Sequence, residues 1–286
     1  MQATIRVFVN GREMENPEAP PVQCNGRLYV PARQLLQRLG ARVRVETARA
    51  CVAVDPQTSK TTIVAGRREG RHGPLLAAAE RVVEAAGGRM DWDAELGVFI
   101  AQRRETWVAK RSLAIDAGHG GRDTGSTTAA GLAEKDLNLA IAHRLQKLVQ
   151  MAGGRAVLTR SRDHHRVMAE RLRRVRSRGV DALISIHHNS HADTSLSGCE
   201  AYFFESDAGR RLAFCLQDEV AQELGLPDRG VREAGFDELR HGAIGAVCKL
   251  AFLSNPKDAA VVASPYYPLQ AALALFRGWR RFCEGL

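Results

Sequence analysis

Apolar segments that alternate with amphipathic segments dominate the sequence beyond residue 110, and this alternation limits the possible folds more than any other feature. Three apolar runs have the length of strands: SLAIDA (112–117), DALISIHHNS (181–190) and AIGAVCKLAFLSN (243–255). The segment DLNLAIAHRLQKLVQMAGG (136–154) instead has apolar residues at helical spacing and a Gly-Gly stop. Strands that alternate with helices predict an α/β fold, with a mainly parallel sheet and helices on both of its faces.

The remaining segments of this region continue the alternation. Two further strands are expected at RAVLTR (155–160) and CEAYFFE (199–205). Three further helices are expected at VMAERLRRVRSRG (167–179), AGRRLAFCLQDEVAQELG (208–225) and YYPLQAALALFRGWRRFC (266–283). We therefore expect one α/β domain over residues 110–286.

Residues 1–106 follow a different pattern and contain an internal repeat. LLQRLGARVRVETARACVAV (35–54) parallels VVEAAGGRMDWDAELGVFIA (82–101) at an offset of 47 residues. Each copy predicts a short helix, a glycine stop and two alternating strands. VFVNGRE (7–13) adds a hairpin signal at its Asn-Gly pair. We therefore expect a small α+β domain to precede the α/β domain.

The charge and the cysteines restrict the possible partners. The net charge is 41 − 32 = +9, which favours an anionic partner. The arginine-rich stretch RLRRVRSR (171–178) has no interleaved aromatic residues, so we interpret it as a solvated helix face and expect no specific nucleic-acid partner. The six cysteines form no CxxC pair and are interpreted as core residues. No run of about 18 apolar residues predicts a transmembrane segment, and no signal peptide is visible at the N-terminus.

Histidines follow two of the expected strands at their carboxyl ends. His119 lies in LAIDAGHGG (113–121), and His187 lies in LISIHHN (183–189). Glu134 stands just before an expected helix. Because active sites of such sheets gather at the carboxyl ends of strands, these side chains are candidates for one site. Two imidazoles and one carboxylate suit Zn²⁺ and leave a fourth position open, as in catalytic zinc sites.

Each of these residues also has a structural interpretation. A single histidine at a strand end is often an ordinary packed residue, and Glu134 is also typical of the first turn of a helix. His188 and His191 compete with His187 as candidate ligands. Spacing alone leaves the choice among these histidines open.

The motifs of the second region occur in the order seen in the zinc-dependent N-acetylmuramoyl-L-alanine amidases of the amidase-3 type, which this region resembles. They are LAIDAGHGGRDTGS, GLAEKDLNLAIAHRL, VLTRSRD, DALISIHHNS, SGCEAYFF and FLSNPKDAAVV. The resemblance implies that His119, Glu134 and His187 hold zinc. It also implies hydrolysis of the amide between N-acetylmuramic acid and L-alanine in peptidoglycan. We accordingly expect a monomer that acts on peptidoglycan in the cell wall or outside the cell.

The first region resembles the copper-amine-oxidase-type N-terminal, or stalk, domain of bacterial surface proteins. The resemblance rests on VFVNGRE, PPVQCNGRLYVPARQLLQRLGA and MDWD. It implies a spacer or a wall-binding module. No copper site is expected, because His72 is the only histidine of the region.

One position departs from the amidase-3 pattern where the family keeps a second essential glutamate, its general base and acid. The family segment PAVLVELGFLSN corresponds to IGAVCKLAFLSN here, so that glutamate falls on Lys249. A neutral lysine amine can accept a proton, and an ammonium can stabilise an oxyanion. A catalytically impaired protein that keeps the zinc fold and binds cell wall would also account for this lysine, as would an engineered Glu-to-Lys substitution.

Four further polar residues are candidates for supporting roles. Glu200 in SGCEAYFF is a second candidate for proton transfer, although a strand residue without function is the simpler interpretation. Arg240 and Asn189 are candidates for substrate binding, because a guanidinium suits a carboxylate-rich peptide. Asp116 is a candidate for orienting a ligand histidine.

Overall fold

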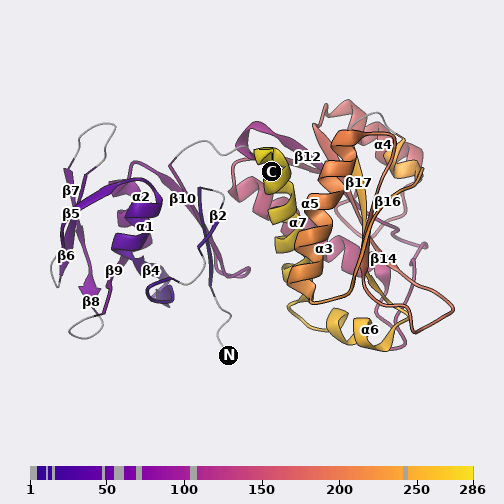
Figure 1. Cartoon of the computed structure of the whole chain (residues 1–286), viewed down its shortest axis with the longest axis horizontal. Coiled ribbons are helices and arrows are strands. Elements are labelled where there is room, and N and C mark those ends of the chain that lie inside the picture. The colour runs from indigo at the N-terminus through magenta and orange to yellow at the C-terminus, as the bar shows by residue number, and fades with distance from the viewer. Residues whose placement is uncertain are drawn as a thin grey trace. The chain divides into compact units, whose positions relative to one another are not determined.

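The chain forms two units in the computed structural model, Met1–Thr106 and Trp107–Leu286. The structure describes residues 5–10, 12–14, 17–46, 49–54, 61–68, 73–103, 108–240 and 244–285. Each unit has its own sheets and helices (Figure 1). The second unit contains the expected strand ends and is therefore the one that positions the candidate site.

The two copies of the internal repeat fold alike in the first unit. One copy comprises α1 (Ala32–Arg38), β5 (Arg42–Glu46) and β6 (Ala50–Val54); the other comprises α2 (Ala79–Ala85), β10 (Arg89–Asp93) and β11 (Val98–Gln102). Gly40 and Gly87 follow the helices with φ of 84° and 68°. The left-handed conformation ends both helices and suits glycine. The predicted pattern of helix, glycine stop and two strands is confirmed.

Three small sheets complete the first unit, in the orders β10-β11-β1-β2, β3-β4-β9-β8 and β5-β6-β7. The remaining strands are β1 (Arg6–Val9), β2 (Arg12–Glu13), β3 (Val22–Cys24), β4 (Arg27–Pro31), β7 (Thr61–Ala65), β8 (Arg67–Arg68) and β9 (Leu75–Ala78). Strands β1 and β2 pair antiparallel, as the hairpin signal predicts. Asn10 has a φ of 49° at this turn, and Gly11 lies outside the described residues.

A six-stranded sheet in the order β13-β12-β14-β17-β15-β16 forms the centre of the second unit. Its strands are β12 (Ser112–Ala117), β13 (Arg155–Leu158), β14 (Ala182–Asn189), β15 (Cys199–Phe203), β16 (Asp228–Glu233) and β17 (Ile244–Phe252). Neighbouring strands are parallel except for β15 and β17, which are antiparallel. The predicted α/β fold with a mainly parallel sheet is confirmed.

Helices cover both faces of this sheet (Figure 1). Helices α3 (Glu134–Met151) and α5 (Asp207–Leu224) pack against the sheet, and α7 (Tyr267–Glu284) packs against both of these helices. Helix α4 (Met168–Ser177) lies on the other face, where Val175 packs with Ala114 and Leu183. Strand β16, helix α6 (Pro256–Val262) and the 3-10 helices η1 (Val108–Lys110) and η2 (Asp237–Leu239) were not predicted from the sequence.

No single helix of the described residues is both long and apolar enough to cross a membrane. Helices α6 and α7 pass that test only as a pair bent by 89°.

The register of the sheet brings polar residues of three strands into one row. His187 of β14 pairs with Lys249 of β17, and Lys249 in turn pairs with Glu200 of β15. Paired residues of neighbouring strands place their side chains on the same face of a sheet. The row His187–Lys249–Glu200 therefore lies beside the loop that follows β12.

Candidate metal centre

The loop after β12 has an unusual backbone that places His119 at the edge of the sheet. Three successive residues, His119, Gly120 and Gly121, have φ of 63°, 131° and 60°. A left-handed conformation costs a non-glycine residue roughly 1–2 kcal/mol. The next two residues are glycines, which adopt a positive φ without that cost. The surrounding contacts therefore need to stabilise only the backbone of His119.

Two buried arginines hold this loop through its carbonyl groups. Arg160 donates from Nε to Ala117 O at 2.8 Å and from Nη2 to Gly118 O at 3.0 Å. Arg171 donates from Nη1 to Ala117 O at 2.8 Å, and it also donates to His119 O. Arg171 comes from the arginine-rich helix and is only 4% exposed. The prediction of a solvated face was therefore wrong at this residue.

Asp116, near the end of β12, connects this strand to neighbouring segments through its side chain. Its carboxylate accepts hydrogen bonds from Thr159 Oγ1 at 2.5 Å, Arg171 Nη1 at 3.1 Å and Ser185 Oγ at 2.9 Å. These three donors account for the burial of its charge.

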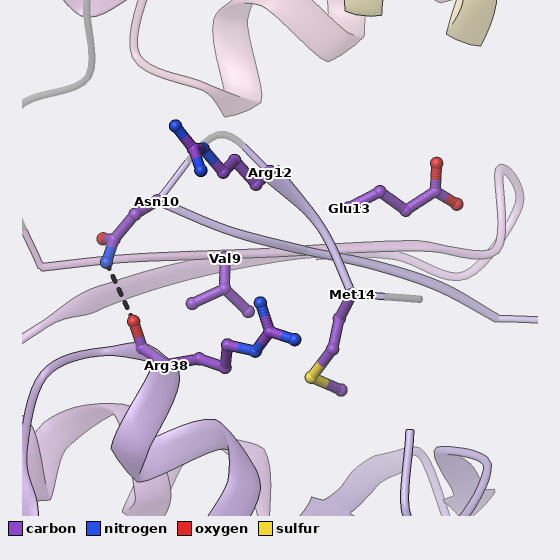
Figure 2. A pocket seen from close by; sticks show the side chains of 6 residues that line it. All are labelled: Val9, Asn10, Arg12, Glu13, Met14 and Arg38. Carbon is purple, nitrogen blue, oxygen red and sulfur yellow. Dashed lines mark hydrogen bonds between the residues drawn. The ribbon is translucent and has the colours of Figure 1, made fainter. Parts of the chain in front are cut away.

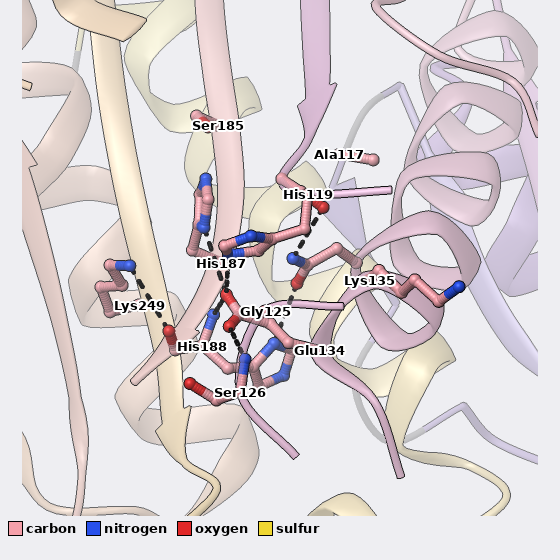
Figure 3. Close-up of polar contacts among 12 residues, drawn as sticks. Ala117, His119, Gly125, Ser126, Glu134, Lys135, Ser185, His187, His188 and Lys249 are labelled. Carbon is pink, nitrogen blue, oxygen red and sulfur yellow. Dashed lines mark hydrogen bonds and ion pairs between the residues drawn. The ribbon is translucent and has the colours of Figure 1, made fainter. Parts of the chain in front are cut away.

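Glu134 brings His119 and His187 together (Figure 3). Its Oε1 lies 3.1 Å from His119 Nε2 and 3.2 Å from His187 Nδ1. The two imidazole rings meet edge to face, with centroids 5.0 Å apart. The backbone N–H groups of His188 and Ser126 donate to the two oxygens of Glu134, each at 2.9 Å. A helix N-terminus thus presents a fixed carboxylate between the imidazoles of two strand ends.

The charges of this group support each other. Burial raises the pKa of Glu134, but hydrogen bonds from His119 and His187 outweigh burial and leave its pKa well below the usual range. Burial lowers the pKa of His119, but Glu134 and Asp123 outweigh it and raise the pKa above the ordinary value. Glu134 is therefore ionised at neutral pH although it is only 2% exposed.

The spacing of these three ligand atoms fits a metal ion. Metal–ligand distances of 2.0–2.2 Å in a tetrahedral zinc site place neighbouring ligand atoms about 3.3 Å apart. The observed separations of 3.1 Å and 3.2 Å from Glu134 Oε1 are close to that value. His119, Glu134 and His187 can hold a metal ion together.

Two glycines make this close approach possible. A Cβ at Gly118 would lie 2.2 Å from His187 Cε1, and a Cβ at Gly125 would lie 2.6 Å from Glu134 Oε2. Real Cβ atoms do not approach other atoms so closely. The backbone at these two glycines therefore lies directly against the candidate ligands. Any residue larger than glycine would clash with them.

The competing histidines are directed elsewhere. His188 is buried, with Nδ1 2.9 Å from Asn138 Oδ1 and Nε2 2.7 Å from Tyr267 Oη. Burial lowers the pKa of His188 to about 3, so this imidazole is neutral. His191 is exposed, and its Nδ1 accepts a hydrogen bond from the backbone of Asp193. Of these three histidines, only His187 faces Glu134.

Lys249 lies beside the group but makes a different kind of contact. Its Nζ donates to the backbone carbonyl of His188 at 3.4 Å (Figure 3). A donated hydrogen bond is consistent with an ammonium group. The structure therefore has a hydrogen-bond donor at the position where the amidase-3 pattern has a proton acceptor.

Glu200 is surrounded by donors. It accepts from Asn189 Nδ2 at 2.6 Å, from Tyr202 Oη at 2.8 Å, and from Arg229 and Arg232. Burial raises the pKa of Glu200, but the hydrogen bonds from Tyr202, Asn189 and Arg232 lower it below the ordinary value. Proton transfer at Glu200 would disrupt these bonds.

Arg240 follows η2 and is exposed. Its Nε donates to Gly235 O at 3.0 Å, and its guanidinium lies over the ring of Phe204 at 5.3 Å. Asn189 ends β14, where its carbonyl accepts from Leu253 N at 2.8 Å.

Glu238 of η2 is a site residue that the sequence patterns did not predict. Its Oε1 lies 3.4 Å from His187 Nε2, on the ring nitrogen that does not face Glu134. Burial raises the pKa of Glu238, but His187 and the charge of Lys249 contribute to a net lowering. Glu238 belongs to a short 3-10 helix with no periodic pattern, so its only sequence signal was its position two residues before Arg240.

A hollow of about 230 Å³ in the first unit offers different chemistry (Figure 2). It is lined by Val9, Asn10, Arg12, Glu13, Met14 and Arg38. Glu13 pairs with Arg6 at 2.6 Å. This lining has two guanidinium groups and no histidine or cysteine, so it suits an anion better than a metal ion.

Both units match known families. Residues 113–280 match the family model described as N-acetylmuramoyl-L-alanine amidase, and this match spans more than half of the chain. Residues 7–70 match the model described as copper amine oxidase N-terminal domain. The two resemblances expected from the sequence motifs are confirmed.

Relatives and solved structures agree with the first match. The chain is 36% identical over 175 residues to YqiI of Bacillus subtilis, covering 60% of this chain and 84% of that protein. It is 33% identical over 183 residues to the N-acetylmuramoyl-L-alanine amidase LytC of Bacillus subtilis, covering 63% of this chain but only 37% of LytC. The structure of the N-acetylmuramoyl-L-alanine amidase AmiC2 of Nostoc punctiforme superposes with a TM-score of 0.57 at 32% identity, covering 59% of this chain and 94% of AmiC2.

Proposed function

Because this chain belongs to the family of N-acetylmuramoyl-L-alanine amidases, we propose that it hydrolyses the amide between N-acetylmuramic acid and L-alanine in peptidoglycan. We further propose that His119, Glu134 and His187 hold a zinc ion for this reaction. The observation that carries the proposal is the placement of His119 Nε2 and His187 Nδ1 at 3.1 Å and 3.2 Å from one oxygen of Glu134.

Zinc bound by these three residues would polarise the scissile carbonyl and lower the pKa of a water molecule. The residues of the chain set up that chemistry. Arg160 and Arg171 fix the backbone that presents His119. The two backbone N–H groups on Glu134 keep its carboxylate between the imidazoles. Bare backbone at Gly118 and Gly125 lets the chain pack directly against His187 and Glu134.

Lys249 is proposed to act as a cation next to the reacting carbonyl, where it stabilises developing negative charge. Its Nζ donates to the carbonyl of His188, a contact that an ammonium can make. A protonated amine cannot accept a proton from water. The absence of a general base at this position typically slows such a reaction by about 10²–10⁴, so we expect a slow enzyme.

Three neighbouring residues are proposed to serve substrate binding and orientation. Arg240 is exposed and can pair with a carboxylate of the peptide stem. Asn189 donates to Glu200 at 2.6 Å and leaves its own amide oxygen to accept an N–H of the substrate. Glu200 is proposed to orient Asn189 rather than to transfer protons, because four side chains donate to it.

The cell wall is the proposed place of action, since LytC and AmiC2 carry the name of an enzyme of peptidoglycan. The first unit is proposed as a spacer or wall-binding module, and the chain as a monomer. The pair of arginines in the hollow of the first unit supports binding of this unit to anionic groups of the wall. Retention of the full chain on insoluble peptidoglycan measures this binding.

Zinc content and wall digestion, measured on one sample, test the central proposal. We expect about one zinc per wild-type chain, and loss of zinc in His119→Ala and His187→Ala. His191→Ala is the matched control, because His191 is exposed and does not face Glu134. Mass spectrometry of digested muropeptides should show free peptide stems above a metal-stripped control. Full zinc content in either ligand variant would contradict the metal assignment.

A second candidate function is wall binding without hydrolysis. The identity of residue 249 favours it, because a lysine that donates to the carbonyl of His188 stands where the family keeps its proton acceptor. In that case the protein binds zinc and retains peptidoglycan but releases no peptide stems above the metal-stripped control.

A further inference from the structure

The two candidate ligand histidines share an arrangement that one zinc triad alone does not explain. His119 faces Glu134 with Nε2 at 3.1 Å and Asp123 with Nδ1 at 2.9 Å. His187 faces Glu134 with Nδ1 at 3.2 Å and Glu238 with Nε2 at 3.4 Å. Each imidazole therefore has the shared carboxylate on one nitrogen and a carboxylate of its own on the other.

Of the two outer ring nitrogens, Nε2 of His187 makes the weaker hydrogen-bonding contact. Its side chain is only 9% exposed, and Nε2 makes no hydrogen bond of good geometry to any residue that the structure describes. An imidazole that binds a metal through Nδ1 carries its hydrogen on Nε2. A buried N–H without an acceptor destabilises the folded state, so metal binding at Nδ1 requires an acceptor at Nε2.

Two carboxylates besides Glu134 lie near His187, and only one of them is available as an acceptor. Asp116, His187 and Glu238 have ligand atoms within 4.8 Å of one another. Asp116 already accepts from Thr159, Ser185 and Arg171. Glu238 therefore remains as the acceptor for the outer nitrogen of His187.

We propose that Glu238 is the positioning residue of the metal centre: it accepts the Nε2–H of His187 and fixes the ring with Nδ1 directed at the metal. This inference rests on the proposed zinc site. A carboxylate in this position also increases the basicity of the nitrogen that binds the metal. Glu238 faces the nitrogen remote from Glu134, so it acts through His187 rather than on the metal.

The element that carries Glu238 is anchored by the two residues that follow it. Leu239 is buried, and Arg240 donates to Gly235 at 3.0 Å and lies over Phe204. The charge of Lys249 contributes to the lowered pKa of Glu238. These contacts hold the carboxylate of Glu238 in place for His187.

The zinc dissociation constant of the full chain, measured by competition with a chelator, tests this role. Glu238→Leu removes the acceptor, and we expect zinc binding about 10–100-fold weaker. Glu238→Gln keeps an acceptor oxygen but loses the charge, so its loss should be smaller. Asp237→Asn is the matched control: it removes an exposed carboxylate from the same 3-10 helix and should bind like wild type.

Two further readouts separate positioning from a general loss of structure. The melting temperature of each metal-free variant shows whether the fold persists, and ¹⁵N NMR of zinc-loaded wild type should show the hydrogen of His187 on Nε2. Equal zinc affinity in wild type, Glu238→Gln and Glu238→Leu would overturn the inference, as would a hydrogen on Nδ1. Should Glu238→Leu fail to fold, Glu238→Gln and the NMR tautomer decide. Failure of the wild type to bind zinc would instead reject the proposed function itself.

Discussion

The two halves of the sheet edge in the second unit are built on different principles. At the ends of β12 and β14, backbone groups and buried arginines hold His119, Glu134 and His187 with little free space. In the neighbouring strands β17 and β15, Lys249 and Glu200 are paired in the register of the sheet. The first half is arranged for binding a metal ion, and the second half lacks a proton acceptor at the expected position.

This difference separates two requirements of hydrolysis: binding of the metal ion and the chemical step. The geometry of the candidate ligands depends on Gly118, Gly125 and the loop after β12. None of these contacts involves the side chain of Lys249, whose hydrogen bond goes to the backbone of His188. Metal binding can therefore persist while the rate of the chemical step changes.

Replacing Lys249 with glutamate should have the largest effect on that rate. Lys249→Glu places a carboxylate next to the metal centre, and we expect amide hydrolysis to rise by about 10²–10⁴, the usual contribution of a general base. Release of peptide stems per unit time, followed by mass spectrometry, measures it. Zinc content should not change.

Lys257→Glu is the control for this prediction, since it makes the same change of charge at an exposed position of α6. Glu238 would lie near the new carboxylate, and repulsion between them would reduce the gain. The double variant Lys249→Glu/Glu238→Gln tests whether that repulsion matters. An unchanged rate in both the single Lys249→Glu variant and the double variant would show that the half formed by β17 and β15 does not limit hydrolysis.

A methyl group added at the half formed by the ends of β12 and β14 tests how closely this half is packed. The Cβ of Gly118→Ala would lie 2.2 Å from His187 Cε1, so the ring must move. We expect a loss of about 1–3 kcal/mol in the free energy of unfolding and zinc binding weaker by about tenfold or more. Thermal unfolding and chelator competition measure the two effects.

Gly131→Ala serves for comparison, because a Cβ there meets no atom within 4 Å although φ is 87°. It should lose some stability from backbone strain without a loss of zinc affinity. Equal zinc affinities of the two alanine variants would mean that the ring of His187 has room to adjust.

The sequence predicted the candidate ligands better than their surroundings, for a physical reason. His119 and His187 follow apolar runs, and parallel strands bring their carboxyl ends to one edge. Glu134 begins a helix with a clear apolar face. Periodicity therefore predicted one shared edge for these residues, and the choice of His187 over its neighbouring histidines came from the family resemblance.

Hydrophobic periodicity could not predict the contacts that depend on irregular backbone. Glu238 lies in a three-residue 3-10 helix, and Arg171 is buried although its helix is rich in arginine. The antiparallel direction of β15 was also not predicted, because an alternating pattern is the same in either direction. These features follow from tertiary packing rather than from local sequence.

The smallest expected effect is a pH dependence of metal binding. Burial lowers the pKa of His119, but Glu134 and Asp123 raise it overall above the ordinary value of 6.5. Zinc requires the neutral imidazole, so zinc affinity should fall as pH falls below this pKa, by about tenfold per pH unit for one proton. His188 contributes nothing near neutrality, because its pKa is lowered to about 3.

Stability of the metal-free protein should change in the opposite direction. The raised pKa of His119 contributes stability that is complete below pH 6.5 and is lost as pH rises through the folded-state value. Asp123→Asn removes one of the two carboxylates that raise this pKa, so it should move both profiles to lower pH. Chelator competition and thermal unfolding between pH 5.5 and 8, a range chosen to span roughly one unit on either side of an ordinary histidine, measure the shift. Identical profiles for wild type and Asp123→Asn would show that proton release from His119 does not control metal binding.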